Sequence, residues 1–125
     1  MKEEKQKILI VDDEPNIVMS LDFLLRKAGY ELFIARNGQE AMDLVLTKKP
    51  QLILLDIMMP GMDGYEVCHE VKNKKGYERT KVIFLSAKSK PNDIEEGMKA
   101  GADEYITKPF SNKQLLQKIK EIVNS

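Results

Sequence analysis

Three short apolar runs constrain the fold of this chain more than any other feature of its sequence. They span residues 8–11, 52–55 and 82–85, and no polar residue interrupts them. A strand with one face in water alternates apolar and polar residues, whereas a strand buried on both faces does not. The runs therefore predict the central strands of a parallel sheet. Two weaker runs, residues 31–35 and 104–107, predict its edge strands.

Segments with helical periodicity separate these runs. After the first run, for example, apolar residues spaced three and four apart predict one helix face from Ile17 to Ala28. Capping-box spacing, a short acceptor followed three residues later by Glu or Gln, predicts helix starts at Asn37, Asp63 and Ser111. Glycines predict helix ends at Gly29, Gly76 and Gly101. Strand and helix thus alternate five times, which predicts a (βα)₅ α/β fold with helices on both faces and right-handed crossovers.

Length and composition indicate one globular domain. The 125 residues predict a single domain over residues 1–125, with a core from about residue 7 to 123. The 20 basic and 20 acidic residues cancel, so no overall charge attracts the chain to nucleic acid or to an acidic membrane. Cys68 is the only cysteine, which excludes an internal disulfide and a cysteine-based zinc site. The chain has neither an apolar leader nor a run of transmembrane length, so a cytoplasmic protein is expected.

Charged and hydroxyl side chains stand where four of the predicted strands end. They are Asp12 and Asp13, Asp56, Ser86, and Lys108. Ligands of an open α/β sheet bind at the carboxyl ends of its strands, so these side chains are expected at one rim. Three converging carboxylates repel one another unless a cation compensates them, and Mg²⁺ suits oxygen ligands of this kind. With Mg²⁺ and the lysine the charges of this site cancel, which lets a phosphoryl group approach.

Four motifs carry a resemblance to a known family. They are ILIVDDE at 8–14, LDIMMPGMDG at 55–64, LSA at 85–87 and GADEYITKPF at 101–110. The chain resembles the receiver domain of bacterial response regulators, the chemotaxis-regulator-like phosphoacceptor domain of two-component systems. This resemblance implies a flavodoxin-like fold, a doubly wound five-stranded parallel sheet of strand order 2-1-3-4-5 in a three-layer sandwich.

The resemblance implies a phosphorylated aspartate and a metal site. Asp56 matches the aspartate that receives the phosphoryl group. Asp13 and Asp56 would bind Mg²⁺ directly, and Asp12 would act through a water molecule. The backbone carbonyl of Met58 would be a further ligand, so its side chain is free to vary.

The resemblance also implies phosphoryl-binding and switching residues. Ser86, the Ala87 N–H and Lys108 would hold the phosphoryl oxygens, while Ser86 and Tyr105 would form the switch. The resemblance further implies that the Lys108–Pro109 peptide bond is cis, which local geometry can achieve because X–Pro bonds have only a small trans preference.

The implied function is phosphoryl transfer from a phosphohistidine of a sensor histidine kinase or a phosphotransfer protein to Asp56. The surface of the fourth helix, fifth strand and fifth helix would then change and act on an effector protein or an output domain. Phosphorylation could also favour a homodimer. Such a domain is not an enzyme, although it carries self-phosphorylation and self-dephosphorylation chemistry.

Two other classes fit parts of the pattern. An aspartyl-phosphate phosphatase on a related fold would need an acid two residues after its nucleophile as general acid. Met58 occupies that place after Asp56, and Glu14 occupies it after Asp12 without the pattern that follows in phosphatases. A flavodoxin-like flavin-binding protein would need a phosphate loop rich in hydroxyls and glycine after the first strand, where this chain is acidic.

Met58 and Lys88 are expected to flank the path of water to an aspartyl phosphate, because they lie two residues after Asp56 and Ser86. A methionine side chain cannot orient the attacking water, and a lysine can cover the phosphoryl oxygens. The sequence therefore predicts slow self-dephosphorylation.

Overall fold

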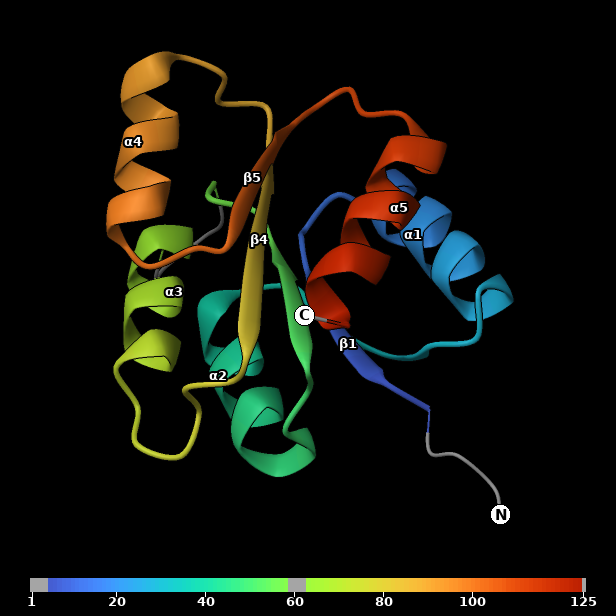
Figure 1. Cartoon of the computed structure of the whole chain (residues 1–125), viewed down its shortest axis with the longest axis horizontal. Coiled ribbons are helices and arrows are strands. Elements are labelled where there is room, and N and C mark those ends of the chain that lie inside the picture. Colours follow the sequence, from blue (N-terminus) through green and yellow to red (C-terminus); the bar gives the residue numbers. More distant parts are fainter. Residues whose placement is uncertain (1–4, 59–62, 125) are drawn as a thin grey trace.

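The structure is a computed structural model that describes residues 5–58 and 63–124. Within these residues five strands alternate with five helices, which confirms the predicted alternation (Figure 1). The elements in chain order are β1 (Lys7–Val11), α1 (Pro15–Lys27), β2 (Glu31–Ala35), α2 (Gly38–Lys48), β3 (Leu52–Leu55), α3 (Gly64–Lys72), β4 (Lys81–Ser86), α4 (Pro91–Lys99), β5 (Glu104–Thr107) and α5 (Asn112–Val123). Over the described part of the chain, every helix is too short or too polar to cross a membrane.

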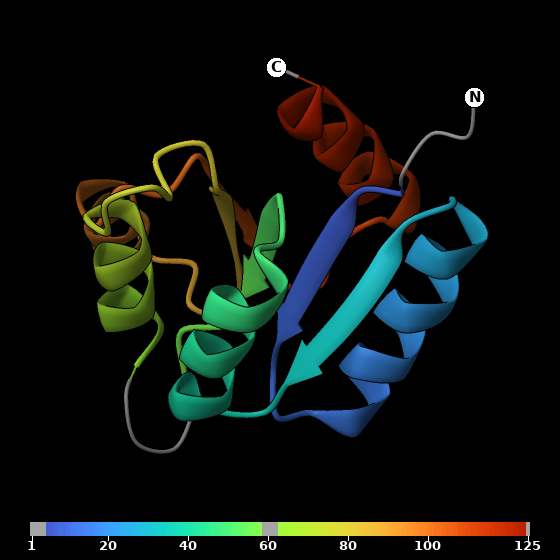
Figure 2. The same cartoon turned by 90° about the horizontal axis from the view of Figure 1, so that it is seen from below.

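The strands form one parallel sheet in the order β2-β1-β3-β4-β5, as the resemblance implies. The two weaker apolar runs are the edge strands β2 and β5. Helices α1 and α5 cover one face of the sheet, and α2, α3 and α4 cover the other (Figures 1 and 2). The molecule is therefore a three-layer sandwich with the flavodoxin-like topology.

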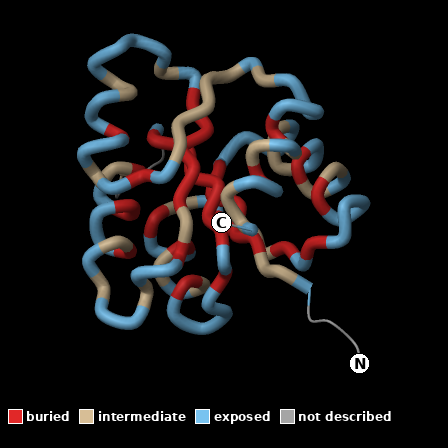
Figure 3. The backbone as a smooth tube through the Cα atoms, in the orientation of Figure 1, coloured by how far each residue is buried: buried red, intermediate tan, exposed pale blue. Residues whose placement is uncertain are grey.

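Each face of the sheet has its own apolar core, because successive side chains of a strand point to opposite faces. In β1, Ile8 and Ile10 pack in the cluster beneath α1 and α5. Leu9 and Val11 pack in the cluster beneath α2, α3 and α4. The buried residues concentrate along the central strands (Figure 3). This burial on both sides explains why the apolar runs contain no polar residue.

The three helix starts predicted from capping-box spacing are confirmed. Side-chain oxygens of Asn37, Asp63 and Ser111 each accept a hydrogen bond from the backbone N–H three residues later. Each cap satisfies one of the donors that a helix leaves open in its first turn.

Two of the three predicted helix ends are confirmed. Gly29 and Gly101 follow α1 and α4 and have positive φ angles. Gly76 also has a positive φ, but it lies in the loop beyond α3, so the helix end predicted there is wrong. α3 stops earlier because Asn73 caps it, donating from both its backbone N–H and its side-chain amide to the carbonyl of His69.

Candidate functional site

The carboxyl ends of β1 and β3 bring three carboxylates together. Asp12, Asp13 and Asp56 can each offer one oxygen atom, and these atoms lie within 4.8 Å of one another. Asp12 and Asp56 are only 2% and 5% exposed, whereas Asp13 faces solvent. A set of oxygen atoms that is buried on one side and open on the other fits a hard divalent cation such as Mg²⁺.

Strand register makes Asp12 and Asp56 neighbours. Val11 pairs with Leu55 in the β1–β3 ladder, so the residues that follow each strand lie side by side. The N–H of Asp56 donates to the carbonyl of Val11 at 2.9 Å, and the N–H of Asp12 donates to the carbonyl of Ala35 at 3.1 Å. Because the backbone of both aspartates extends the sheet, their side chains are held in place before any ligand binds.

The start of α3 packs against the backbone of Asp56. The N–H of Gly64 donates to the carbonyl of Ile57 at 3.0 Å. A Cβ atom at position 64 would overlap the Asp56 carbonyl oxygen, so a glycine is required for this close approach. The start of α3 is thereby fixed against the residues that directly follow β3.

Lys108 is the cation beside this cluster. Its Nζ lies 3.0 Å from Asp12 Oδ2, 3.3 Å from Glu14 Oε1 and 3.9 Å from Asp56 Oδ2. The Lys108–Pro109 peptide bond is cis, as predicted. Four sequence-predicted residues, the three aspartates and this lysine, are therefore brought to one pocket.

Burial and charge shift the ionisation of Asp56 and Lys108. Burial raises the pKa of Asp56, the charge of Lys108 lowers it in part, and the charge of Asp12 raises it further. Burial would lower the pKa of Lys108, but the hydrogen bond and charge of Asp12, with the charges of Asp56 and Glu14, raise it above its ordinary value. The pocket thus keeps its lysine charged and leaves its carboxylates short of positive charge.

Glu14 also belongs to this pocket, although the sequence did not predict it as a site residue. With it, four carboxylates face one ammonium and leave a net charge of −3, which a divalent cation would reduce to −1 rather than to zero. The only sequence feature that could have indicated its role is its position directly after Asp12 and Asp13 in the first motif. Only the turn into α1 brings its side chain to Lys108.

Comparison with known proteins agrees with this geometry. The family model described as response regulator receiver domain matches residues 8–120. The chain belongs to the response regulator receiver domain family.

Solved structures of receiver domains share the fold over nearly the whole chain. The signal receiver domain of a signal transduction histidine kinase from Syntrophus aciditrophicus is 35% identical, with a TM-score of 0.88, covering 95% of this chain and 90% of that one. A CheY-like response regulator receiver domain protein from Methanospirillum hungatei JF-1 is 32% identical, with a TM-score of 0.90 and coverages of 97% and 95%. The chemotaxis response regulator CheY4 of Vibrio cholerae is 30% identical, with a TM-score of 0.89 and coverages of 95% and 99%.

Membership in this family gives the acidic pocket a context. Receiver domains are signalling domains of two-component systems that interact with histidine kinases and effectors. They typically bind Mg²⁺ at an acidic pocket, and Asp12, Asp13 and Asp56 form such a pocket in this receiver domain.

The receiver domain holds Ser86 and Tyr105 next to each other. The Oγ of the buried Ser86 accepts a hydrogen bond from the N–H of Lys88 at 3.2 Å. The hydroxyl of Tyr105 donates to the carbonyl of the same lysine at 2.6 Å. Burial raises the pKa of Tyr105, and a hydrogen bond with Ser86 lowers it in part. The two residues predicted to form the switch are therefore linked through the backbone of Lys88.

The ring of Tyr105 is seated beneath α4. It packs against the ring of Phe84, with the two centroids 5.8 Å apart. The place for it exists because α4 carries a glycine: a Cβ atom at Gly97 would lie 2.9 Å from the Tyr105 ring and 3.0 Å from the Phe84 ring. A change in the position of this ring would therefore directly alter its packing against α4.

Met58 and Ala87 stand close to the carboxyl ends of β3 and β4. The N–H of Met58 donates to Asp56 Oδ1 at 3.4 Å, and its side chain is exposed. Ala87 is exposed as well. The carbonyl of Met58 as a metal ligand and the N–H of Ala87 as a phosphoryl donor stay predictions. Residues 59–62, in the middle of the second motif, lie outside the described residues.

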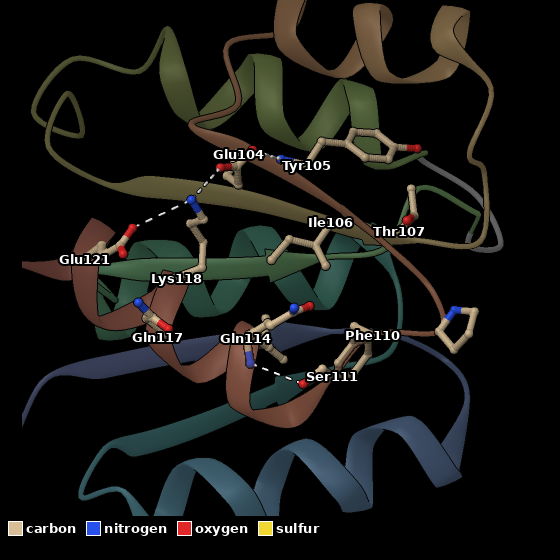
Figure 4. Close-up of a pocket in the computed structure, with 12 residues that line it drawn as sticks. Glu104, Tyr105, Ile106, Thr107, Phe110, Ser111, Gln114, Gln117, Lys118 and Glu121 are labelled. Atoms are coloured by element: carbon tan, nitrogen blue, oxygen red, sulfur yellow. Dashed lines mark hydrogen bonds and ion pairs between the residues drawn. The ribbon is translucent and has the colours of Figure 1, made fainter.

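A groove lies between β5 and α5 (Figure 4). Near one end, Lys118 of α5 bridges Glu104 of β5 at 3.3 Å and Glu121 at 3.6 Å. Thr107 and Pro109 also line the groove, so it borders the segment that carries Lys108. The acidic pocket and the outer surface of β5 and α5 are thus connected through one short stretch of chain.

Proposed function

We propose that this chain acts as a single receiver domain over residues 1–125, in which Asp56 accepts a phosphoryl group from a phosphohistidine of a sensor histidine kinase or a phosphotransfer protein. The observation that carries the proposal is the convergence of Asp12, Asp13 and Asp56 within 4.8 Å, with Lys108 beside them. Asp56 directly follows the central strand β3. Its Oδ2 lies 3.9 Å from the Nζ of Lys108, beyond hydrogen-bond distance.

The residues of the pocket fit Mg²⁺. Asp13 and Asp56 would hold the ion directly, with the carbonyl of Met58, and Asp12 would act through a water molecule. This all-oxygen donor set, with one exposed side, leaves coordination positions for water and for phosphoryl oxygens. When bound, the cation neutralises negative charge on the pocket and on the incoming phosphoryl group.

The transfer is an in-line displacement at phosphorus. A carboxylate oxygen of Asp56 forms a bond to phosphorus while the phosphorus–nitrogen bond of the phosphohistidine breaks, and the imidazole nitrogen keeps the electron pair. Such a reaction needs positioning and charge stabilisation more than covalent help. Lys108, the Ser86 hydroxyl and the N–H of Ala87 would hold the phosphoryl oxygens. Asp56 would then carry an additional negative charge close to Ser86.

The readout would pass through Ser86 and Tyr105. The Ser86 hydroxyl now accepts from Lys88 and would gain a stronger, charge-assisted hydrogen bond by turning to the phosphoryl group. The Tyr105 hydroxyl donates to the carbonyl of the same Lys88, and the Tyr105 ring lies beneath Gly97 of α4. A movement of Ser86 would therefore change the position of the Tyr105 ring and of α4. The surface of α4, β5 and α5 would then bind an effector protein, an output domain or a second copy of the chain.

Phosphorylation of the intact chain tests this function. Incubation with acetyl phosphate and Mg²⁺ should add one phosphoryl group, measured by intact-protein mass spectrometry, and chelation of the metal should prevent it. Asp56→Asn should abolish the modification, whereas Asp43→Asn, a change at an exposed acid on α2, should leave it unchanged. Full labelling of the Asp56→Asn variant would contradict the proposal.

A further inference from the structure

The ammonium of Lys108 is not centred on Asp56. It lies within hydrogen-bond distance of Asp12 and Glu14, at 3.0 and 3.3 Å, but 3.9 Å from the nearest Asp56 oxygen. A phosphoryl group on Asp56 would bring further negative charge to that side of the pocket and draw the ammonium toward it, which weakens a contact on the other side. Asp12 is fixed by the sheet and is buried, so the contact that can open is the one with Glu14.

The local structure leaves the side chain of Glu14 free to make this contact. Glu14 is the N-cap residue of α1, but its side chain accepts no capping hydrogen bond. Its N–H donates to Asp12 Oδ1 at 2.9 Å, which fixes the backbone, and Pro15 at the first helical position needs no N–H acceptor. The carboxylate therefore extends to Lys108, with 59% of its side chain exposed.

We propose that Glu14 is a positioning residue that competes with the phosphoryl group for Lys108. In the unphosphorylated chain it holds the ammonium on the Asp12 side of the pocket, and it releases the ammonium when Asp56 is phosphorylated. This inference rests on the proposed function, because it assumes that Lys108 binds the phosphoryl group. Glu14 thereby weakens phosphoryl binding and sets the level of donor or kinase at which the domain responds.

Two substitutions separate the contact from the charge. Glu14→Gln removes the charge and weakens the contact. Glu14→Asp keeps the charge, but its side chain is one methylene shorter, and aspartate at an N-cap favours the N–H of Ile17 in the first turn of α1. Both variants should release Lys108. Glu66→Gln is the matched control, because Glu66 is an exposed acid in the first turn of α3, which begins against Asp56, and it has no contact with Lys108.

The measurement is binding of beryllofluoride, a phosphoryl mimic, by isothermal titration calorimetry at a Mg²⁺ concentration that saturates each variant. Both Glu14 variants should bind it about threefold to fivefold more tightly than the parent chain, the range of a partly exposed ion pair. Glu66→Gln should stay within about twofold of the parent.

Equal affinity of the parent and both Glu14 variants would overturn the inference while leaving the proposed function intact. Tighter binding by Glu14→Gln and by Glu66→Gln, with Glu14→Asp unchanged, would overturn it too, because charge alone would then explain the effect. Absence of beryllofluoride binding by the parent chain would overturn the proposed function and this inference with it.

Discussion

Two lysines at opposite ends of the sheet make ion pairs of very different kinds. Lys72 Nζ, at the amino ends of the strands, lies 2.7 Å from Asp103 Oδ2 and donates to the carbonyl of Thr80 at 2.8 Å. Asp103 Oδ2 also accepts the N–H of Val82 at 2.8 Å. Lys108 Nζ, at the carboxyl ends, lies near three acids, Asp12, Glu14 and Asp56, and Asp13 belongs to the same cluster of carboxylates.

The two lysine side chains are similarly buried, 16% exposed for Lys72 and 10% for Lys108, so burial does not distinguish them. The charge balance does. One acid meets one lysine in the first pair, and each has further hydrogen bonds to the backbone. Around Lys108 the acids outnumber the cation. A balanced pair holds elements of the fold together, whereas an unbalanced cluster is stabilised by a ligand that brings positive charge or by the loss of one of its negative charges.

Asp103→Ala is expected to have the largest effect on stability. It leaves Lys72 without its acid and the buried N–H of Val82 without its acceptor, so the free energy of unfolding should fall by about 2–4 kcal/mol. Urea unfolding followed by circular dichroism measures the loss. Asp103→Asn, which keeps an acceptor for Val82, should lose only about half as much. An alanine variant as stable as the parent would show that this pair does not hold the fold together.

Asp56→Asn should have the opposite sign. The substitution removes the charge of a buried carboxylate whose pKa is raised. The free energy of unfolding of the metal-free chain at pH 7 should therefore increase by about 1–3 kcal/mol. The folded state binds the Asp56 proton more tightly than the unfolded state does. The ionised carboxylate therefore lowers the stability of the folded state as the pH rises above 3.8, the ordinary pKa of this group. The gain should shrink as the pH falls toward 4.

Urea unfolding of the parent and of Asp56→Asn in a chelator, at several pH values, tests this expectation. A variant that is less stable than the parent at pH 7 would mean that the acidic pocket is balanced in the absence of metal, and that the contrast with the Lys72–Asp103 pair is wrong.

The smallest effect on free energy is expected from substitutions of Met58 and Lys88, whose side chains can be replaced without disturbing the fold. The Met58 side chain is exposed, and Lys88 contacts Ser86 and Tyr105 only through its backbone. A Met58→Asn, Lys88→Glu double variant should unfold like the parent but lose its phosphoryl group roughly threefold to tenfold faster, about 1 kcal/mol in the barrier. The rate constant follows from mass spectrometry after removal of the donor. Unchanged loss would mean that neither side chain controls access of water.

Much of the fold follows from short-range sequence patterns. The apolar runs predicted β1, β3 and β4 because burial on both faces excludes polar residues, and the weaker runs predicted the two edge strands. Three caps followed from spacing alone, since a cap is made within one turn of helix. Gly76 did not end a helix, because a positive φ is needed in a loop as well as at a helix end, and α3 already ends at Asn73.

The site was predictable where it depended on strand ends. Asp12, Asp13, Asp56 and Lys108 follow strands of a parallel sheet, so topology alone brings them to one edge. The tertiary structure decided the contacts that depend on side-chain reach across elements: Glu14 on Lys108, Lys72 on Asp103, and the Tyr105 ring under Gly97. These partners lie between 8 and 94 positions apart in the sequence or depend on how a helix packs, and no local pattern records such a distance. Local preferences therefore determined the elements and what stands at their ends, while packing decided which of the charges are balanced.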